Sequence, residues 1–143
     1  MRAAPHVVIV GGGFGGLYAA KALAREPVRV TLFDKTNHHT FQPLLYQVAT
    51  AGLNPADIAV PIRRALRDCD NVTVLMGEVV GVDVDEKGIE LEGGERVEYD
   101  YLIVATGATH SYFGRDELAR FAPGLKTIDD GLLVRQRIYL ARS

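Results

Sequence analysis

Wholly apolar runs alternate with amphipathic stretches in the first part of the chain. Residues 7–10 are four consecutive aliphatic residues that lead directly into glycine, which is typical of a parallel strand buried on both faces. From Phe14 to about Arg25, apolar and small residues recur at helical spacing, and Pro27 ends this segment. Residues 28–33 form a second strand-like run. Strand, helix and strand in about thirty residues predict one βαβ unit.

The middle of the chain continues this alternation less regularly. A loop follows the second predicted strand, and we expect a second helix over residues 60–67. Pro61 falls in the first turn of that helix, where a missing N–H costs little. Residues 72–76 are again largely aliphatic, so we predict a third parallel strand there.

A different pattern occupies residues 77–101, where turn signals at 86–88 and 93–94 separate short alternating stretches. This pattern predicts an antiparallel β-meander. Its half-buried positions are predicted to be Val80, Val82, Val84, Ile89 and Leu91. Residues 101–105 are apolar again and predict a strand that rejoins the parallel sheet, and residues 131–142 predict a helix. The expected fold class is α/β, a Rossmann-like parallel sheet with an inserted antiparallel meander.

Composition narrows the function classes. The chain has 143 residues, of which 48% are hydrophobic and 24% charged, and its net charge is −2, so it lacks the basic balance of a nucleic-acid-binding protein. Cys69 is the only cysteine, which excludes a disulfide within this sequence and a cysteine metal cluster. The sequence shows no signal peptide, and no apolar run approaches the roughly 20 residues of a transmembrane helix. We therefore expect a cytoplasmic location.

The glycines between the first strand and the first helix form the motif G-x-G-x-x-G. Gly11 permits the tight turn out of the strand, Gly13 leaves room for a pyrophosphate against the backbone, and Gly16 lets the helix pack close to the sheet. The N-terminus of the helix offers N–H groups and a partial positive charge to the phosphates. The motif therefore predicts an adenine-dinucleotide site.

Asp34 strengthens this prediction. It ends the second strand and follows Gly16 at close to the spacing expected of the acid that binds the ribose hydroxyls. A carboxylate there would repel a 2′-phosphate, with a Coulomb energy on the order of 4 kcal/mol for two charges about 4 Å apart near a protein surface. Lys35 softens this repulsion but follows the end of the strand, so we do not expect NADP at this site.

The order of the later elements resembles the FAD domain of the two-dinucleotide-binding flavoprotein oxidoreductases. In that group a meander precedes the last strand of the sheet, and here that strand leads into Val104-Ala105-Thr106-Gly107-Ala108. The resemblance implies that the Ala-Thr-Gly turn packs beside the dinucleotide and that backbone near Glu78 and Val79 meets the adenine. It implies FAD as the cofactor.

Three longer segments resemble the type II NADH dehydrogenases, which are single-subunit, non-proton-pumping NADH:quinone oxidoreductases. They are residues 37–52 (NHHTFQPLLYQVATAG), their continuation 53–63 (LNPADIAVPIR), and 107–114 (GATHSYFG) ahead of 121–127 (FAPGLKT). The resemblance implies hydride transfer from NADH to the flavin and two-electron reduction of a quinone. It brings residues 42–47 near the flavin ring, with Gln47 and Thr50 as polar neighbours. No residue here is nominated as a catalytic acid, base or nucleophile, because the flavin carries the chemistry.

The residues predicted to contact the cofactor are Gly11, Gly13, Phe14, Gly15, Gly16, Asp34, Lys35, Gln47, Thr50, Val79, Ala105, Thr106 and Gly107. His38 and His39 are adjacent and lack a third ligand, so we interpret them as hydrogen-bonded loop residues and predict no metal site. The paired cysteines of the disulfide reductases in the same superfamily are absent from this sequence.

The resemblance also carries an expectation about completeness. Members of the family continue into a second Rossmann unit for NADH and end in membrane-associating helices, so we interpret these residues as one truncated FAD-binding lobe. We expect the parent protein to be peripheral on the cytoplasmic membrane, and the truncated surface to cause self-association near the C-terminal helix. The alternative that the glycine motif leaves open is a free-standing module that binds NAD or an adenylate without catalysis.

Overall fold

The computed structural model describes residues 3–141. It divides the chain into two compact units. The first unit contains residues 1–39 and 61–107, and the second contains residues 40–60 and 108–143. The prediction of a single lobe depends on how these units are placed relative to each other, and it stays a prediction.

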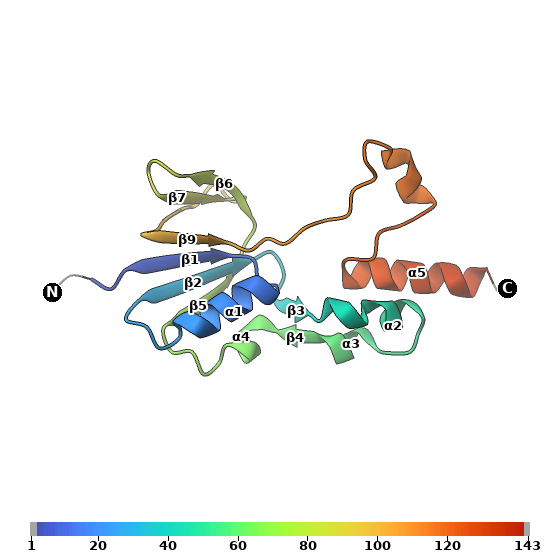
Figure 1. The fold of residues 1–143 in the computed structure, drawn as a ribbon, viewed down its shortest axis with the longest axis horizontal. Helices are drawn as coiled ribbons and strands as arrows, with labels where there is room; N and C mark the ends of the chain where they lie inside the picture. The colour runs from blue at the N-terminus through green and yellow to red at the C-terminus, as the bar shows by residue number, and fades with distance from the viewer. Residues whose placement is uncertain (1–2, 142–143) are drawn as a thin grey trace. The chain divides into compact units, whose positions relative to one another are not determined.

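A parallel sheet with a helix against it forms the body of the first unit (Figure 1). The sheet has four strands in the order β5-β2-β1-β9. Its strands are β1 (His6–Val10), β2 (Arg29–Asp34), β5 (Val72–Met76) and β9 (Tyr101–Val104). Helix α1 (Phe14–Leu23) connects β1 to β2. The predicted βαβ unit, the third strand at residues 72–76 and the return of the last strand beside β1 are all confirmed.

Strand β1 is buried on both faces, as its uninterrupted apolar run predicts. Val7 and Ile9 pack with Leu17 and Ala20 of α1 in one core cluster. The alternate residues of β1 pack into a second cluster against the meander and its neighbours, whose buried members are Val8, Val10, Phe33 and Ile89. Because successive side chains of a strand point to opposite faces, one short strand supplies both cores.

The predicted meander is present as β6 (Val79–Asp83), β7 (Gly88–Leu91) and β8 (Arg96–Glu98), which pair antiparallel in that order. The prediction of its buried positions is partly wrong. Three residues predicted to be half-buried are largely exposed: Val80 at 58%, Val82 at 46% and Val84 at 75%. The burial along β6 alternates with the opposite phase, so that its partly buried positions are Val79, Gly81 and Asp83. Ile89 of the central strand β7 takes the buried position instead, at 1% exposure.

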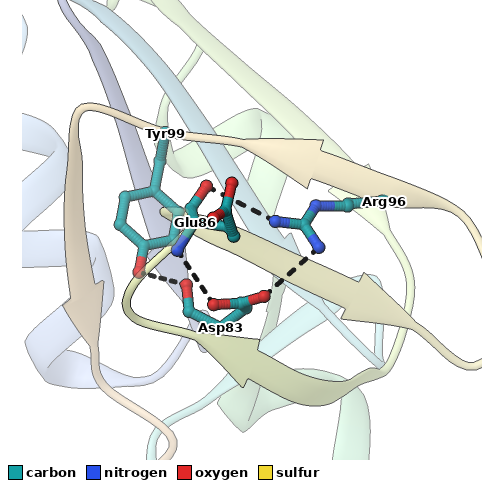
Figure 2. A network of polar contacts seen from close by, with 4 residues as sticks. All are labelled: Asp83, Glu86, Arg96 and Tyr99. Atoms are coloured by element: carbon teal, nitrogen blue, oxygen red, sulfur yellow. Dashed lines mark hydrogen bonds and ion pairs between the residues drawn. The ribbon is translucent and has the colours of Figure 1, made fainter.

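A polar network closes the first hairpin of the meander (Figure 2). Asp83 accepts a hydrogen bond from the Glu86 backbone N–H at 2.9 Å, and its other carboxylate oxygen lies 3.4 Å from Nη1 of Arg96. Tyr99 donates its hydroxyl to the Asp83 carbonyl at 3.3 Å. The Glu86 N–H, and after it the Arg96 charge, hold the pKa of the Asp83 carboxyl below its usual value against a smaller opposing effect of burial. The network fixes the turn that the sequence predicts at residues 86–88.

The prediction of a helix over residues 60–67 is wrong in its extent. Residues Ala59–Pro61 form strand β4, which pairs with β3 (His38–Thr40), and helix α4 covers only Ile62–Ala65. Pro61 has φ −55° and ψ 128° and therefore precedes the helix instead of occupying its first turn. Pairing with β3 keeps these residues extended, which the local sequence pattern does not reveal.

The second unit consists of short helices around a small apolar cluster. Its elements are η1 (Gln42–Leu44), α2 (Leu45–Ala49), α3 (Pro55–Ile58), η2 (Asp116–Arg120) and α5 (Ile128–Leu140). Leu45, Val48 and Ile58 are its buried members. A Cβ on Gly131 of α5 would lie 3.3 Å from Leu45, so α5 packs closely on α2.

The boundaries of α5 differ from the prediction. The helix starts at Ile128 because Thr127 and Asp130 form a capping box, in which the Asp130 N–H donates to the Thr127 hydroxyl at 3.1 Å. It ends at Leu140, and Arg142, the predicted last residue, lies outside the described residues.

Leu140 is 68% exposed, and Leu132, Leu133 and Tyr139 are 40% or more exposed. The expected self-association near this helix stays a prediction. Between residues 3 and 141, no helix is long and apolar enough to cross a membrane.

His6 is a buried polar residue at the start of β1, only 7% exposed. Its Nδ1 lies 2.8 Å from the Glu98 carbonyl, which can only accept, so Nδ1 carries the proton. The Thr31 hydroxyl, 2.8 Å from Nε2, therefore donates to the imidazole. Burial, followed by the charge of Arg29, lowers the pKa of His6 below its usual 6.5. The neutral imidazole links β1, β2 and β8.

The burial of His6 predicts a pH dependence of stability. The unfolded chain binds a proton on this imidazole at about pH 6.5 and the folded chain only at lower pH. The free energy of unfolding therefore falls as the pH drops from 6.5 through the folded pKa, by at most about 1.4 kcal/mol per pH unit. Urea unfolding between pH 8 and 5, compared with His6→Gln, isolates this contribution. Equal pH slopes for the two proteins would contradict it.

Candidate nucleotide-binding site

The glycine motif forms a tight turn directly against the end of the last strand. Gly11 has a φ of +106°, and a Cβ there would collide with the Ala105 carbonyl oxygen. The Gly11 N–H donates to the Phe33 carbonyl at 2.8 Å, which ties the turn to β2. A Cβ on Gly16 would collide with the Gly11 carbonyl oxygen. The predicted conformational roles of Gly11 and Gly16, a sharp turn and a close helix approach, are confirmed.

Gly13 differs from these two glycines because a Cβ there would meet none of the described residues within 4 Å. It is the N-cap of α1, and its φ of −72° is one that any residue adopts. Gly15 lies in the first turn, and a Cβ on it would reach the Ala105 methyl at 3.6 Å. The open space at Gly13, beside the N-terminus of a ten-residue helix, suits the oxygens of an anion.

Asp34 sits at the end of β2 with both carboxylate oxygens engaged. One oxygen accepts the Gly12 N–H at 2.5 Å. The other accepts the Thr36 N–H and the Thr36 hydroxyl, both at 2.7 Å. The Gly77 N–H donates to the backbone carbonyl of Asp34 at 2.9 Å, which joins the ends of β2 and β5. The carboxylate is thus held in one orientation at the carboxyl edge of the sheet.

A cavity of about 190 Å³ opens at this edge. Five predicted site residues line it, and they are Gly11, Asp34, Lys35, Val79 and Thr106. Its other lining residues are Val10, Phe33, Gly77 and Glu78. Typical small-molecule pockets have roughly 300–1,000 Å³, so this cavity suits one part of a dinucleotide. Carboxyl ends of parallel strands are the usual place for such ligands.

The remaining predicted site residues lie outside the cavity lining. Gly13, Phe14, Gly15 and Gly16 belong to the turn and to α1, and Ala105 faces Gly11 and Gly15. Gly107 has a φ of +74° and follows the last strand.

Gln47 and Thr50 lie in the second unit. Gln47 donates to the Tyr46 hydroxyl at 2.9 Å, and the Thr50 hydroxyl donates to the Tyr46 carbonyl at 3.0 Å. Their contact with a cofactor stays a prediction.

Sequence reasoning missed Gly77 and Phe33 as lining residues, and Gly12 as the partner of Asp34. Gly77 follows the third strand directly, so its place at the carboxyl edge could have been inferred from the predicted strand order. Phe33 reads as an ordinary core residue, at 2% exposure, and carries no such signal. Gly12 occupies a variable position of the motif, and only the structure reveals its bond to Asp34.

The two neighbouring histidines have different surroundings. His39 Nδ1 lies 3.1 Å from the Gly12 carbonyl, and its ring packs edge-on against Phe14 with centroids 4.7 Å apart. His38 Nδ1 lies 3.4 Å from Oδ1 of the adjacent Asn37. Both rings are hydrogen-bonded, as predicted, but the prediction of a loop is wrong because both residues belong to β3. His39 bonds to the glycine turn.

A family model for pyridine nucleotide-disulphide oxidoreductases matches residues 5–139, which is nearly the whole chain. The chain belongs to this family. The chain therefore has the Rossmann-like oxidoreductase fold that its sequence predicts.

Two curated relatives from Mycobacterium tuberculosis are type II NADH:quinone oxidoreductases. NdhA is 55% identical over 136 residues, which cover 93% of this chain and 29% of the relative. Ndh is 52% identical over 139 residues, which cover 95% of this chain and 30% of the relative. The resemblance to the type II NADH dehydrogenases is thereby confirmed. The chain spans about 30% of the length of these relatives.

A solved structure is similar to this chain in fold as well. The NDH2 of Plasmodium falciparum, determined in complex with NADH, superimposes with a TM-score of 0.82 at 29% identity. The match covers 94% of this chain and 28% of that one. The predicted fold class, a Rossmann-like sheet with an inserted meander, is confirmed.

The contrast between Gly13 and Gly16 predicts that substitution by alanine lowers the stability at Gly16 and leaves it nearly unchanged at Gly13. Gly16→Ala places a methyl group on the Gly11 carbonyl and should lower the free energy of unfolding by about 2 kcal/mol or more. Gly13→Ala meets open space at an ordinary φ and should leave the stability of the chain within about 0.5 kcal/mol of the wild type. Chemical unfolding of both variants measures the difference, and similar losses would contradict the assigned geometry.

Proposed function

We propose that this chain is the FAD-binding part of a flavoprotein that oxidises NADH and passes two electrons to a quinone. The observation that carries the proposal is the position of Asp34, whose fixed carboxylate lines a cavity next to the open backbone at Gly13. A carboxylate there can accept both ribose hydroxyls of an adenosine. The open Gly13 backbone is a cradle that a side chain would fill, and it fits a pyrophosphate at the N-terminus of α1.

The choice of FAD over NAD rests on the relatives and on the meander. Both mycobacterial relatives are named as type II NADH:quinone oxidoreductases, and the pairwise identities of 55% and 52% extend over nearly all of this chain. The meander supplies Val79 and Glu78 to the cavity, at the place where the adenine would lie. A simpler nicotinamide site continues with regular strand–helix units instead.

In this proposal the protein binds and orients, and the flavin supplies the transfer of hydride and electrons. Asp34 fixes the adenosine through its ribose. The backbone N–H groups at the start of α1 hold the pyrophosphate. Gln47 and Thr50, both anchored on Tyr46, are the polar side chains that we assign to the neighbourhood of the flavin ring. Gln47→Ala in the full-length protein should therefore change the flavin potential or the turnover.

Further parts of the proposal concern the full-length protein. NADH and quinone are its substrates, as the names of the relatives suggest. We propose a peripheral location on the cytoplasmic face of the membrane, and self-association of the isolated chain through the exposed apolar residues near α5.

The first test is a calorimetric titration of the purified chain with FAD, NAD and AMP in parallel. We expect FAD to bind most tightly. Asp34→Asn should weaken FAD binding roughly ten- to a hundredfold, because the charged acceptor of the ribose hydroxyls is lost. Asp85→Asn is the matched control, since it removes the same charge from the exposed turn of the meander. Preferential binding of NAD would replace the proposal with the simpler nucleotide module.

The same carboxylate predicts discrimination against a 2′-phosphate. The wild-type chain should bind AMP more tightly than adenosine 2′,5′-bisphosphate, because two like charges this close repel by on the order of a few kcal/mol. Asp34→Asn should reduce the ratio of the affinities for AMP and adenosine 2′,5′-bisphosphate at least tenfold, whereas Asp85→Asn should not change this ratio. Equal affinity of the wild type for both nucleotides would argue against Asp34 as the ribose-binding acid.

A further inference from the structure

Gly12 is held from both sides by side chains that the glycine motif itself does not include. Its N–H donates to Asp34 Oδ2 at 2.5 Å. Its carbonyl oxygen accepts from Nδ1 of His39 at 3.1 Å, because a carbonyl can only accept. The two peptide units that flank Gly12 therefore each have one side chain that fixes their orientation.

The second of these peptide units is the one that matters for an anion. The Gly12 carbonyl and the Gly13 N–H belong to the same planar trans peptide and point in opposite directions. A bond from His39 to the Gly12 carbonyl therefore directs the Gly13 N–H away from His39. Nothing among the described residues lies within 4 Å of a Cβ built on Gly13, so a ligand can approach this backbone.

A peptide between two glycines is easily rotated, because neither residue has a Cβ that restricts φ and ψ. Rotation by half a turn would present the Gly12 carbonyl oxygen, in place of the Gly13 N–H, to the open side. An oxygen dipole facing a pyrophosphate repels it, whereas an N–H attracts it. The glycines of the motif thus leave room for the ligand but do not restrict the orientation of the Gly12–Gly13 peptide. Residues outside the motif must fix that orientation.

His39 is itself held in place. Its ring packs edge-on against Phe14, with an interplanar angle of 88° and centroids 4.7 Å apart. Its backbone belongs to β3, which pairs with β4, and just before it the Asn37 carbonyl accepts the Ile62 N–H at 3.0 Å. Strand pairing and ring packing together fix the imidazole, so that its Nδ1 proton can hold the Gly12 carbonyl.

We propose that His39 is a positioning residue for the pyrophosphate: its Nδ1–H fixes the Gly12–Gly13 peptide so that the Gly13 N–H faces the ligand. The proposal rests on the proposed function, the binding of FAD by this chain. Phe14 then has two roles, since it begins α1 and its ring orients the imidazole.

The test replaces His39 with three residues that differ in where they can donate. Asparagine offers its amide N–H near the place of Nδ1, glutamine offers its amide near the place of Nε2, and alanine offers neither. His39→Ala should weaken the binding of FAD and ADP roughly ten- to a hundredfold, and His39→Asn should restore most of the affinity. Adenosine, which has no phosphate, should bind equally to all variants. His38→Ala is the matched control and should leave every affinity unchanged, because the His38 imidazole bonds to the side chain of its neighbour Asn37.

A ligand-free measurement separates this proposal from the proposed function. We expect His39→Ala to shift the ¹³C carbonyl resonance of Gly12 and the ¹⁵N resonance of Gly13, and His39→Asn to return both toward the wild-type values. Rescue of FAD binding by glutamine and not by asparagine would overturn the proposal, because Nε2 would then touch the ligand directly. Unchanged resonances in His39→Ala would also overturn it. A wild-type chain that binds neither FAD nor ADP would refute the proposed function and the ligand part of this inference, while the resonances would still report on the peptide.

Discussion

The close approach of α1 to the turn after β1 is the constraint on which the rest of the first unit depends. A Cβ on Gly16 would overlap the Gly11 carbonyl, and a Cβ on Gly11 would overlap the Ala105 carbonyl. Helix, turn and last strand therefore meet backbone to backbone. Because protein interiors are close-packed, this contact fixes the distance between the helix and the sheet. It also directs the N-terminus of α1 toward the carboxyl edge, where the cavity lies.

Two opposite demands meet in the glycine turn. Access for a ligand requires residues without side chains, but such residues leave the backbone free to rotate. The structure resolves this with side chains from outside the motif, since Asp34 holds the Gly12 N–H and His39 lies against the Gly12 carbonyl. Asp34 thus has a structural bond in addition to its proposed role with the ribose. A preorganised backbone of this kind costs no reorganisation when a ligand arrives.

The meander has a structural task as well as a place in the site. It covers the face of the sheet opposite α1, where Ile89 packs with Val8 and Phe33. The same element brings Val79 to the cavity. Burial of His6, which bonds to the Glu98 carbonyl in β8, adds a polar link between the meander and the first strand. Core packing and site construction therefore use the same elements.

The parallel strands, helix α1, the turn at Gly11 and the acid at the end of β2 could all be predicted from the amino-acid sequence. These features are encoded locally, because side-chain period and the need for glycine at positive φ act within a few residues. Long-range packing determines which meander residues are buried, why residues 59–61 are extended, and that Phe33 lines the cavity with Asp34. Long-range packing also brings Asp34 and His39 to the two sides of Gly12. Each of these outcomes depends on which strands become neighbours, and strand pairing between distant segments leaves no trace in a local pattern.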